Sequence, residues 1–568
     1  MTLGQGIRLS PRSRGALTAT ALLALALAAC AVRPAATAAP APAARPDILL
    51  IVADDLGWSD MGAWGGEIET PNLDALASRG LRLTNFHTAP TCSPTRAMLL
   101  TGVDHHRSGM GAMTETLAFS PQYRGQPGYE GHLNQRVVTV AELLRDAGYA
   151  TLMAGKWHVG YETPDLPPAR GFDRSFALLQ GGAQHFDGGP LMPTDASSGF
   201  RADGFAVAWP AGRFSTDHFT DLMLDFLRAV PREQPVFAYA AYTAPHWPLQ
   251  APDALIRKYQ DRYSGGPAAL RAARLDRLRQ LGLLADESHA ADPAPSQAEW
   301  AALPAEERAR SARIMAVYAA MVENLDSNVG RLIAGLRDSG RLENTIILFM
   351  SDNGAEGMDA ESTPMPGMQE WIARTFDNSL ENVGRPGSYV TQGRFWAPVS
   401  NLPFRGVKGA THEGGIRTPA FVVLPSGATG RIDAYTHVLD LTPTFLAWAG
   451  ATHPGPEYRG RGVLAPEGRL LPLPGLGAPP ADGRVLSFEL FGNRATQAGT
   501  LKIVSPWRGP AGPGPWQLFD VSSDPGERHD LAAGRSADLA RLVGLHEAWM
   551  RDYGVIMPAK DFAGYSSK

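Results

Sequence analysis

The sequence predicts an α/β fold in which helices cover both faces of a large, mostly parallel sheet, followed by a small C-terminal α+β region with an antiparallel sheet. Several apolar runs lack the alternation of half-buried strands, as is typical of parallel strands buried on both faces. Helical segments separate these runs, which is the β-α-β order of parallel sheets. After Leu471 the composition changes, and short strands alternate with Pro- and Gly-rich turns.

Residues 1–29 are predicted to be a lipoprotein signal peptide. Three arginines precede the apolar stretch 15–29, which is too short to span a bilayer comfortably. The stretch runs into "LAAC", which is typical of bacterial lipoproteins and makes Cys30 the lipidated residue; an ordinary signal peptide with a chance cysteine is the alternative. The Ala- and Pro-rich segment 30–45 is predicted to be a tether. We expect an exported protein, anchored by lipid on the periplasmic side of a bacterial membrane or at the cell surface.

Charge and cysteine content restrict the function further. The formal charge of −5 at pH 7 argues against a general nucleic-acid-binding protein, which would present a basic surface. The chain has 2 cysteines, Cys30 and Cys92. With lipid on Cys30, Cys92 has no disulfide partner, although exported proteins normally pair their cysteines. The lone cysteine at position 92 therefore needs a chemical explanation.

The main region is predicted to span residues 46–470, and its strands are apolar runs with polar or turn residues at their ends. The first run is β-branched and aliphatic and stops at two carboxylates, so it is predicted to be a buried parallel strand. The predicted strands are DILLIVADD (47–55), YATLMAGKWH (149–158), QPVFAYAAYTAPHWP (234–248), NTIILFMSDNGAE (344–356) and TPAFVVLPSG (418–427).

Helices are predicted at 71–80, 139–147 and 310–340. A further helix at 265–284 lies in a long insertion, and its basic face is expected to be solvated. The C-terminal region, 471–568, is predicted to hold three strands and a closing helix. These are RVLSFELFG (484–492), TLKIVSPW (500–507), PWQLFDV (515–521) and the helix 536–553.

Polar residues follow four of the predicted strands at their carboxyl ends, the edge at which open α/β sheets bind ligands. Each alone has an ordinary explanation, such as a helix cap, a turn, a surface lysine or a packed histidine. Three carboxylates and an amide together form an oxygen ligand set that suits Ca²⁺ or Mg²⁺ and not zinc. The polar residues at these four strand ends are Asp54, Asp55, Lys156, His158, His246, Asp352 and Asn353.

Cys92 lies at the predicted start of a helix. Pro94 stands near the first helical position and Gly102 follows the last, which is typical of helix ends. A helix N-terminus favours anions and is expected to lower the pKa of a thiol. A soft thiolate is nevertheless a poor ligand for a hard cation. The predicted site needs an oxygen at position 92.

These residues resemble a type I sulfatase, a formylglycine-dependent enzyme of the alkaline phosphatase superfamily. "CSPTR" (92–96) fits the family motif Cys-x-Pro-x-Arg, and "ADD", "GYATLMAGKWHVG" (148–160), "SDNG" and "VKGATHEGGIRTP" (407–419) are similar to its other motifs. The likeness covers nearly the whole chain from residue 46. "DHHRSGMGAMTE" (104–115) and "FELFGNRA" (488–495) look most like bacterial arylsulfatases. The resemblance implies an alkaline phosphatase-like fold with residues 46–470 as the catalytic domain.

The resemblance also implies how position 92 supplies oxygen. In the family a maturation enzyme oxidises the motif cysteine, here Cys92, to Cα-formylglycine. Its hydrate attacks sulfur and forms a covalent sulfo-enzyme intermediate. One divalent cation, Ca²⁺ in preference to Mg²⁺, is then expected to be held by the converted Cys92 and by Asp54, Asp55, Asp352 and Asn353.

The remaining site residues receive their roles from the same resemblance. Arg96 is expected to hold the aldehyde hydrate, and Lys156 and Lys408 to hold the sulfate oxygens. His246 is expected to donate a proton to the leaving alcohol. His158 is expected to take the proton of the second hydroxyl, so that sulfate leaves and the aldehyde returns.

The predicted function is hydrolysis of sulfate monoesters, with aryl sulfates favoured, to an alcohol or phenol and inorganic sulfate. The expected partners are a small sulfate ester, a formylglycine-generating or other sulfatase-maturing enzyme, and the membrane. Two alternatives remain open. One is a phosphonate monoester or phosphodiester hydrolase of the same superfamily, and the other is a non-catalytic surface lipoprotein that binds anions.

Overall fold

The structure is a computed structural model that describes residues 45–117, 119–195, 199–292, 295, 297–362, 365, 367–477 and 483–559. The predicted signal peptide, the lipidated Cys30 and nearly all of the tether lie outside these residues. The described residues belong to one compact unit, and the predicted boundary between 470 and 471 stays a prediction. No helix in the described ranges has both the length and the apolar character that crossing a membrane requires.

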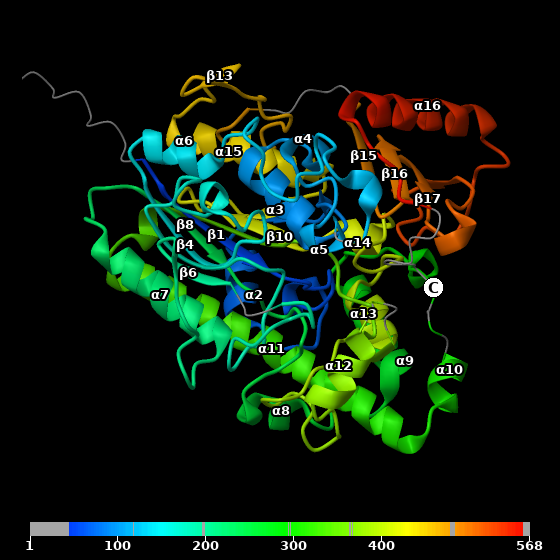
Figure 1. Ribbon diagram of the computed structural model, residues 1–568. Helices are drawn as coiled ribbons and strands as arrows, with labels where there is room; N and C mark the ends of the chain where they lie inside the picture. The colour runs from blue at the N-terminus through cyan, green and yellow to red at the C-terminus, as the bar shows by residue number, and fades with distance from the viewer. Residues whose placement is uncertain are drawn as a thin grey trace, which may run out of the picture. The chain divides into compact units, whose positions relative to one another are not determined.

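The large sheet has 10 strands in the order β11-β2-β10-β9-β1-β8-β4-β5-β6-β7. Figure 1 labels β1, β4, β6, β8 and β10 of this sheet. Its centre is a block of adjacent parallel strands, which confirms the predicted fold class. The block consists of β9 (Thr345–Ser351), β1 (Asp47–Ala53), β8 (Val236–Ala241), β4 (Ala150–Lys156) and β5 (Arg174–Leu178). The flanking strands are β11 (Gly430–Ile432), β2 (Leu81–Leu83), β10 (Ala420–Val423), β6 (Phe200–Ala202) and β7 (Phe205–Ala206).

Strand β1 shows why the central strands are uniformly apolar. Every residue of β1 is buried. Leu49 and Ile51 pack into the hydrophobic core on one face of the sheet, whereas Leu50 and Val52 pack into the core on the other face. Since side chains alternate between faces along a strand, a strand with a core on each side must be apolar at every position.

Helices cover the two faces as predicted (Figure 1). One core takes apolar side chains from α2 (Pro71–Ser78), α7 (Ser215–Ala229) and α11 (Ala305–Asp338). The other takes them from α3 (Cys92–Thr101), α6 (Val140–Asp146) and α15 (Leu441–Ala449). The other α-helices described in this region are α4 (His105–Ser108), α5 (Thr114–Leu117), α8 (Asp253–Tyr259), α9 (Gly266–Gln280), α10 (Gln297–Ala302), α12 (Met368–Thr375), α13 (Gly393–Ser400) and α14 (Glu413–Ile416).

Strand β10 differs from the other predicted strands because it runs antiparallel to β9. Ala420 at its start pairs with Met350 near the end of β9. The segment 407–419, which leads into β10, therefore reaches the edge where the parallel strands end. The reversal brings Lys408 to the predicted site, although Lys408 precedes its strand rather than following it.

The C-terminal region contains a four-stranded antiparallel sheet packed against α16 (Ser536–Tyr553). The three predicted strands and the helix are confirmed. Strand β16 was missed because its sequence, NRATQA, is largely polar, yet Thr496 and Gln497 are buried in it. The strands are β15 (Val485–Leu490), β16 (Asn493–Ala498), β17 (Leu501–Ser505) and β18 (Gln517–Asp520).

The predicted insertion helix is α9, and the expectation that its basic face is solvated is wrong for Arg274. This side chain is buried. Its guanidinium donates to Asp60 Oδ1 at 2.6 Å and to Glu67 Oε2 at 2.7 Å. Both acids lie in the segment after β1, so the arginine ties the insertion to the edge where β1 ends.

Candidate active site

All the predicted site residues lie buried at the carboxyl edge of the parallel strands. Each has no more than 3% of its surface exposed. Hydrogen bonds and ion pairs connect most of them directly, and His158 follows Lys156 by two residues. They are Asp54, Asp55, Cys92, Arg96, Lys156, His158, His246, Asp352, Asn353 and Lys408.

Asp54, directly after β1, joins position 92 to Lys156. Lys156 at the end of β4 donates from Nζ to Asp54 Oδ2 at 2.7 Å. Cys92, the first residue of α3, lies with its Sγ 3.3 Å from Asp54 Oδ1. The helix start that the sequence predicts therefore places residue 92 beside a carboxylate and an ammonium group.

Asp55 is the second acid of this cluster and has a strained backbone. Its φ of 66° lies in the left-handed region, which non-glycine residues rarely adopt. Asn353 Nδ2 donates to Asp55 Oδ1 at 2.6 Å, and Lys408 Nζ lies 2.8 Å from the same oxygen. His246 Nε2 lies 3.7 Å from Asp55 Oδ2. The carboxylate thus faces an amide, a lysine and a histidine from three separate segments.

Arg96 lies one turn into α3 and holds Asp352. Its Nε and one terminal nitrogen donate to Asp352 Oδ2 at 3.1 and 2.8 Å. The other terminal nitrogen donates to the Lys156 carbonyl at 3.0 Å and to the Tyr239 hydroxyl at 3.2 Å. Burial acts to raise the pKa of Asp352, but Arg96 and the nearby lysines hold it below its ordinary value. Asp352 is therefore an ionised carboxylate.

The donor set fits a hard divalent cation. Burial and the charge of Asp352 raise the pKa of Asp54 to about 7 in spite of Lys156, so negative charge is crowded here. Ligand atoms of Asp54, Asp55, Cys92 and His246 lie within 4.8 Å of one another. Asn353 Oδ1 is buried without a hydrogen-bond partner among the described residues. Crowded carboxylates and an unpartnered oxygen are the groups that a bound cation would satisfy.

The expected lowering of the Cys92 pKa is wrong. Burial and the charge of Asp54 raise the pKa of the thiol well above its ordinary value, against the opposing effect of Lys156 and Lys408. Desolvation thus outweighs the start of α3. Since the thiolate is the nucleophilic form of cysteine, an unconverted Cys92 is a poor nucleophile in this fold.

His246 and His158 face different acids. His246 Nδ1 bonds its neighbour, the Trp247 carbonyl, at 2.6 Å, which leaves Nε2 toward Asp55. Burial, with the charges of Lys408 and Lys156, lowers the pKa of His246 well below its ordinary value. His158 Nε2 lies 2.9 Å from Glu115 Oε1.

Sequence reasoning missed three residues around this cluster. Glu115 contacts His158, Tyr239 contacts Arg96, and Glu356 Oε2 lies 3.6 Å from Lys408 Nζ. Only Glu356 stands near a predicted strand exit. Glu115 belongs to the 104–115 segment that supported the resemblance, but no spacing rule links it to a histidine far along the chain.

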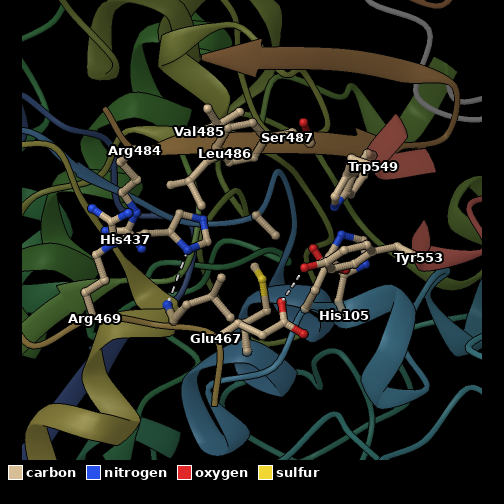
Figure 2. A pocket seen from close by; sticks show the side chains of 15 residues that line it. His105, His437, Glu467, Arg469, Arg484, Val485, Leu486, Ser487, Trp549 and Tyr553 are labelled. Carbon is tan, nitrogen blue, oxygen red and sulfur yellow. Dashed lines mark hydrogen bonds between the residues drawn. The ribbon is translucent and has the colours of Figure 1, made fainter. Parts of the chain in front are cut away.

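A separate cavity of about 150 Å³ lies between α3, α4 and the C-terminal sheet (Figure 2). Its lining includes His105, His437, Arg484 and Trp549, and Tyr553 donates to Glu467 across it. None of the predicted site residues is among the described residues that line it. The cavity is therefore distinct from the acidic cluster.

Residues 46–451 match the family model described as Sulfatase. The chain belongs to the sulfatase family. The sulfatase is 42% identical to an uncharacterized sulfatase of Schizosaccharomyces pombe over 92% of this chain and 96% of the relative. It is also 42% identical to an arylsulfatase of Klebsiella aerogenes, over 72% of this chain and 88% of the relative.

Comparison with solved structures agrees with the family assignment. The crystal structure of Ps i-CgsB matches the sulfatase with a TM-score of 0.62 and 25% identity, covering 92% of this chain and 95% of that chain. The alkaline phosphatase-like fold and the family resemblance are confirmed. Members of the family are sulfuric ester hydrolases, and the family implies a formylglycine and a divalent metal. The buried cluster fits both.

Proposed function

We propose that the sulfatase hydrolyses aryl sulfates, using formylglycine made from Cys92 and one bound Ca²⁺. The observation that carries the proposal is the contact of Cys92 with Asp54 in a buried cluster that also contains Lys156 and Lys408. The identity to an arylsulfatase supports the aryl class. The same identity favours an enzyme over the non-catalytic lipoprotein alternative.

The cation and the converted residue supply the chemistry that the other side chains lack. When bound, the cation withdraws charge from a sulfate oxygen, and the hydrated aldehyde provides an oxygen nucleophile. Asp54, Asp55, Asp352 and Asn353 would hold the cation, and Arg96 keeps Asp352 ionised and in place.

The cationic side chains oppose the charge that develops on the ester. Lys156 and Lys408 pair with Asp54 and Asp55 in the structure. In the proposed reaction their ammonium groups would bind the sulfate oxygens next to the cation. Positive groups fixed in a dry site stabilise such charge without reorganisation. His246 Nε2, the nitrogen that faces Asp55, would pass a proton to the leaving oxygen, and the negative charge of a bound ester favours its protonated form.

Mass spectrometry of residue 92 tests the proposal. Trypsin releases residues 83–96 as one peptide, which contains Cys92. In protein co-produced with a sulfatase-maturing enzyme we expect the mass loss that accompanies replacement of CH₂–SH by an aldehyde. We also expect aryl sulfate turnover, and its loss in Cys92→Ala. Active protein that carries only unmodified cysteine would rule out the proposed nucleophile.

We also propose that the protein is exported and anchored through lipid on Cys30. Support comes from the sequence alone: a basic and apolar leader, the "LAAC" tetrapeptide and an Ala- and Pro-rich tether.

A further inference from the structure

His158 and Glu115 form a closely packed pair beside the cluster. His158 lies two residues after the end of β4, and its φ of 58° is again in the left-handed region. Its Nε2 lies 2.9 Å from Glu115 Oε1, and the Tyr161 hydroxyl donates to the same oxygen at 2.9 Å. The imidazole is buried, whereas about a quarter of the Glu115 side chain is exposed, at 26%. The contact with Glu115 therefore holds the His158 ring at Nε2 and does not involve Nδ1.

That other nitrogen, His158 Nδ1, is buried and has no hydrogen-bond partner among the described residues. Buried polar atoms are rarely left unpaired, and an exception points to a ligand or a catalytic role. Burial lowers the pKa of His158 in spite of Glu115, and the charges of Lys156 and Arg96 lower it further. A neutral imidazole with one unused nitrogen thus lies beside the cationic groups of the site.

We propose that Glu115 is a positioning residue that fixes the tautomer of His158. The proposal rests on the proposed function and on the role that the family resemblance implies for His158, which is to accept the proton of the second hydroxyl at residue 92. An ionised carboxylate can only accept hydrogen bonds, so the single proton of a neutral His158 lies on Nε2. Nδ1 then keeps its lone pair and can act as the base.

The surroundings keep the ring in this orientation. A Cβ added at Gly181 would lie 2.9 Å from His158 Cε1 and 3.1 Å from Nε2, so the backbone at Gly181 closes over the ring. Tyr161 holds the Glu115 oxygen that accepts from His158. Although burial raises it, contact with His158 keeps the pKa of Glu115 at about 2, and the carboxylate stays ionised.

The proton transfer assigned to this pair balances without a further reagent. Nδ1 takes the hydroxyl proton, the oxygen–hydrogen electron pair forms the aldehyde C=O bond, and the carbon–oxygen bond to sulfate breaks with its electrons leaving on sulfate. A base with the wrong tautomer would carry a proton on Nδ1 and could not start this step. Phenol release in the first turnover does not require it.

Glu115→Gln tests the assignment, because the amide is nearly the same size but can donate to Nε2 and so shift the proton to Nδ1. With nitrophenyl sulfate as the substrate, we expect Glu115→Gln to release nitrophenol in the first turnover at the wild-type rate. Its steady-state turnover should then be reduced about 10²-fold or more. Glu115→Asp should restore part of kcat. Tyr161→Phe should reduce it less than Glu115→Gln, since the carboxylate remains.

Glu489→Gln is the matched control. Glu489 Oε2 lies 3.1 Å from His106 Nε2, and both side chains are buried, but neither belongs to the acidic cluster. We expect Glu489→Gln to change stability and leave burst and steady-state rates as in the wild type. A structural role for Glu115 would instead lower both rates of Glu115→Gln together, and that result would overturn the assignment.

A second readout does not depend on formylglycine. In ¹⁵N-histidine-labelled protein carrying Cys92→Ala, the His158 signals, assigned by their loss in His158→Gln, should show protonated Nε2 and unprotonated Nδ1. Adding Glu115→Gln should reverse the pattern. A proton on Nδ1 with Glu115 intact would refute the tautomer assignment. If Cys92→Ala still hydrolysed aryl sulfates, the proposed function would fail while the tautomer result stood on its own.

Discussion

Asn353 contributes to the site an oxygen that the protein itself leaves unused. Its Nδ2 bonds Asp55, while its buried Oδ1 has no partner among the described residues. Around it lie three carboxylates, one of which, Asp54, has a pKa raised to about 7 by burial and by its neighbour Asp352. A cation bound by these residues would contribute to stability as well as to chemistry.

We predict that Ca²⁺ stabilises the chelator-treated protein and that Asn353→Ala weakens this effect. A cation that binds only the folded state at 100 times its Kd adds about 2.7 kcal/mol to the free energy of unfolding. Thermal melts with Ca²⁺ or Mg²⁺ should show a concentration-dependent rise in Tm, larger for Ca²⁺. An undiminished rise in Asn353→Ala would remove this residue from the ligand set.

Single residues were predictable where a strand exit marked them. Asp54, Asp55, Asp352 and Asn353 follow strands that are recognisable from their apolar runs. The pKa of Cys92 was not predictable, because burial depends on the folded surroundings and outweighs the helix end. Glu115 and Tyr239 reach the site only through the tertiary arrangement, which no local pattern encodes.

At the level of elements, buried ion pairs tie the C-terminal sheet to the segment that carries Lys408. Lys502 of β17 lies with its Nζ 2.7 Å from Glu413 Oε1 and 3.0 Å from Glu527 Oε1, and all three side chains are fully buried. Glu413 opens α14, five residues after Lys408. The C-terminal sheet therefore helps to fix the 407–419 segment.

We expect Lys502→Met to lower the free energy of unfolding by about 3–5 kcal/mol, because it leaves buried carboxylates without their cation. Arg228→Ala is the comparison: its pair with Asp225 is 66% exposed on each side and should be worth about 0–1 kcal/mol. Urea unfolding measures both. Equal losses in the two variants would contradict a role for the buried network.

His106 links α4 to β15 and predicts a pH dependence. Burial lowers its pKa, but hydrogen bonds to Asp104 and Glu489 outweigh burial and raise the pKa of His106 to about 9 from an ordinary 6.5. A raised histidine pKa means that its contribution to stability is complete below about pH 6.5 and is lost as the pH rises through about 9. The free energy of unfolding should fall across this window, and His106→Gln should flatten the fall. A slope unchanged in His106→Gln would assign the effect to another group.

Element prediction succeeded where hydrophobicity is continuous and failed where it is not. The central strands are apolar at every position and were found. β16 was missed because its buried residues are polar and are satisfied within the sheet. The direction of β10 was not foreseen, since an apolar run carries no sign of its orientation, and the buried Arg274 on α9 shows that a basic helix can face acids in the interior.

For the molecule as a whole, the cluster does not distinguish sulfur from phosphorus esters. Sulfate and phosphate esters would present similar oxygen atoms to the same metal ion and lysine side chains. We expect a higher kcat/KM for an aryl sulfate than for a matched aryl phosphate diester or phosphonate monoester. A phosphorus ester with the higher kcat/KM would favour the phosphonate monoester or phosphodiester hydrolase alternative.

The proposed anchor also belongs to the whole chain. Cells that express the full sequence with labelled palmitate should incorporate the label into the protein, and the protein should sediment with membranes. Cys30→Ser should abolish both, while Cys92→Ala should leave both unchanged. Label retained in Cys30→Ser would indicate an ordinary signal peptide.

The burial of residue 92 means that any enzymatic modification of this residue has to come before folding. Cys92 is 1% exposed, and every side chain of α3 is buried. A modifying enzyme must bind the chain around its target residue, and in the folded molecule the segment around Cys92 is buried and cannot be bound. The conversion that we propose for Cys92 would therefore compete with folding in each new chain. A chain that folded first would keep the Cys92 sulfur and lack the proposed nucleophile, and a maturation enzyme would no longer reach the buried residue.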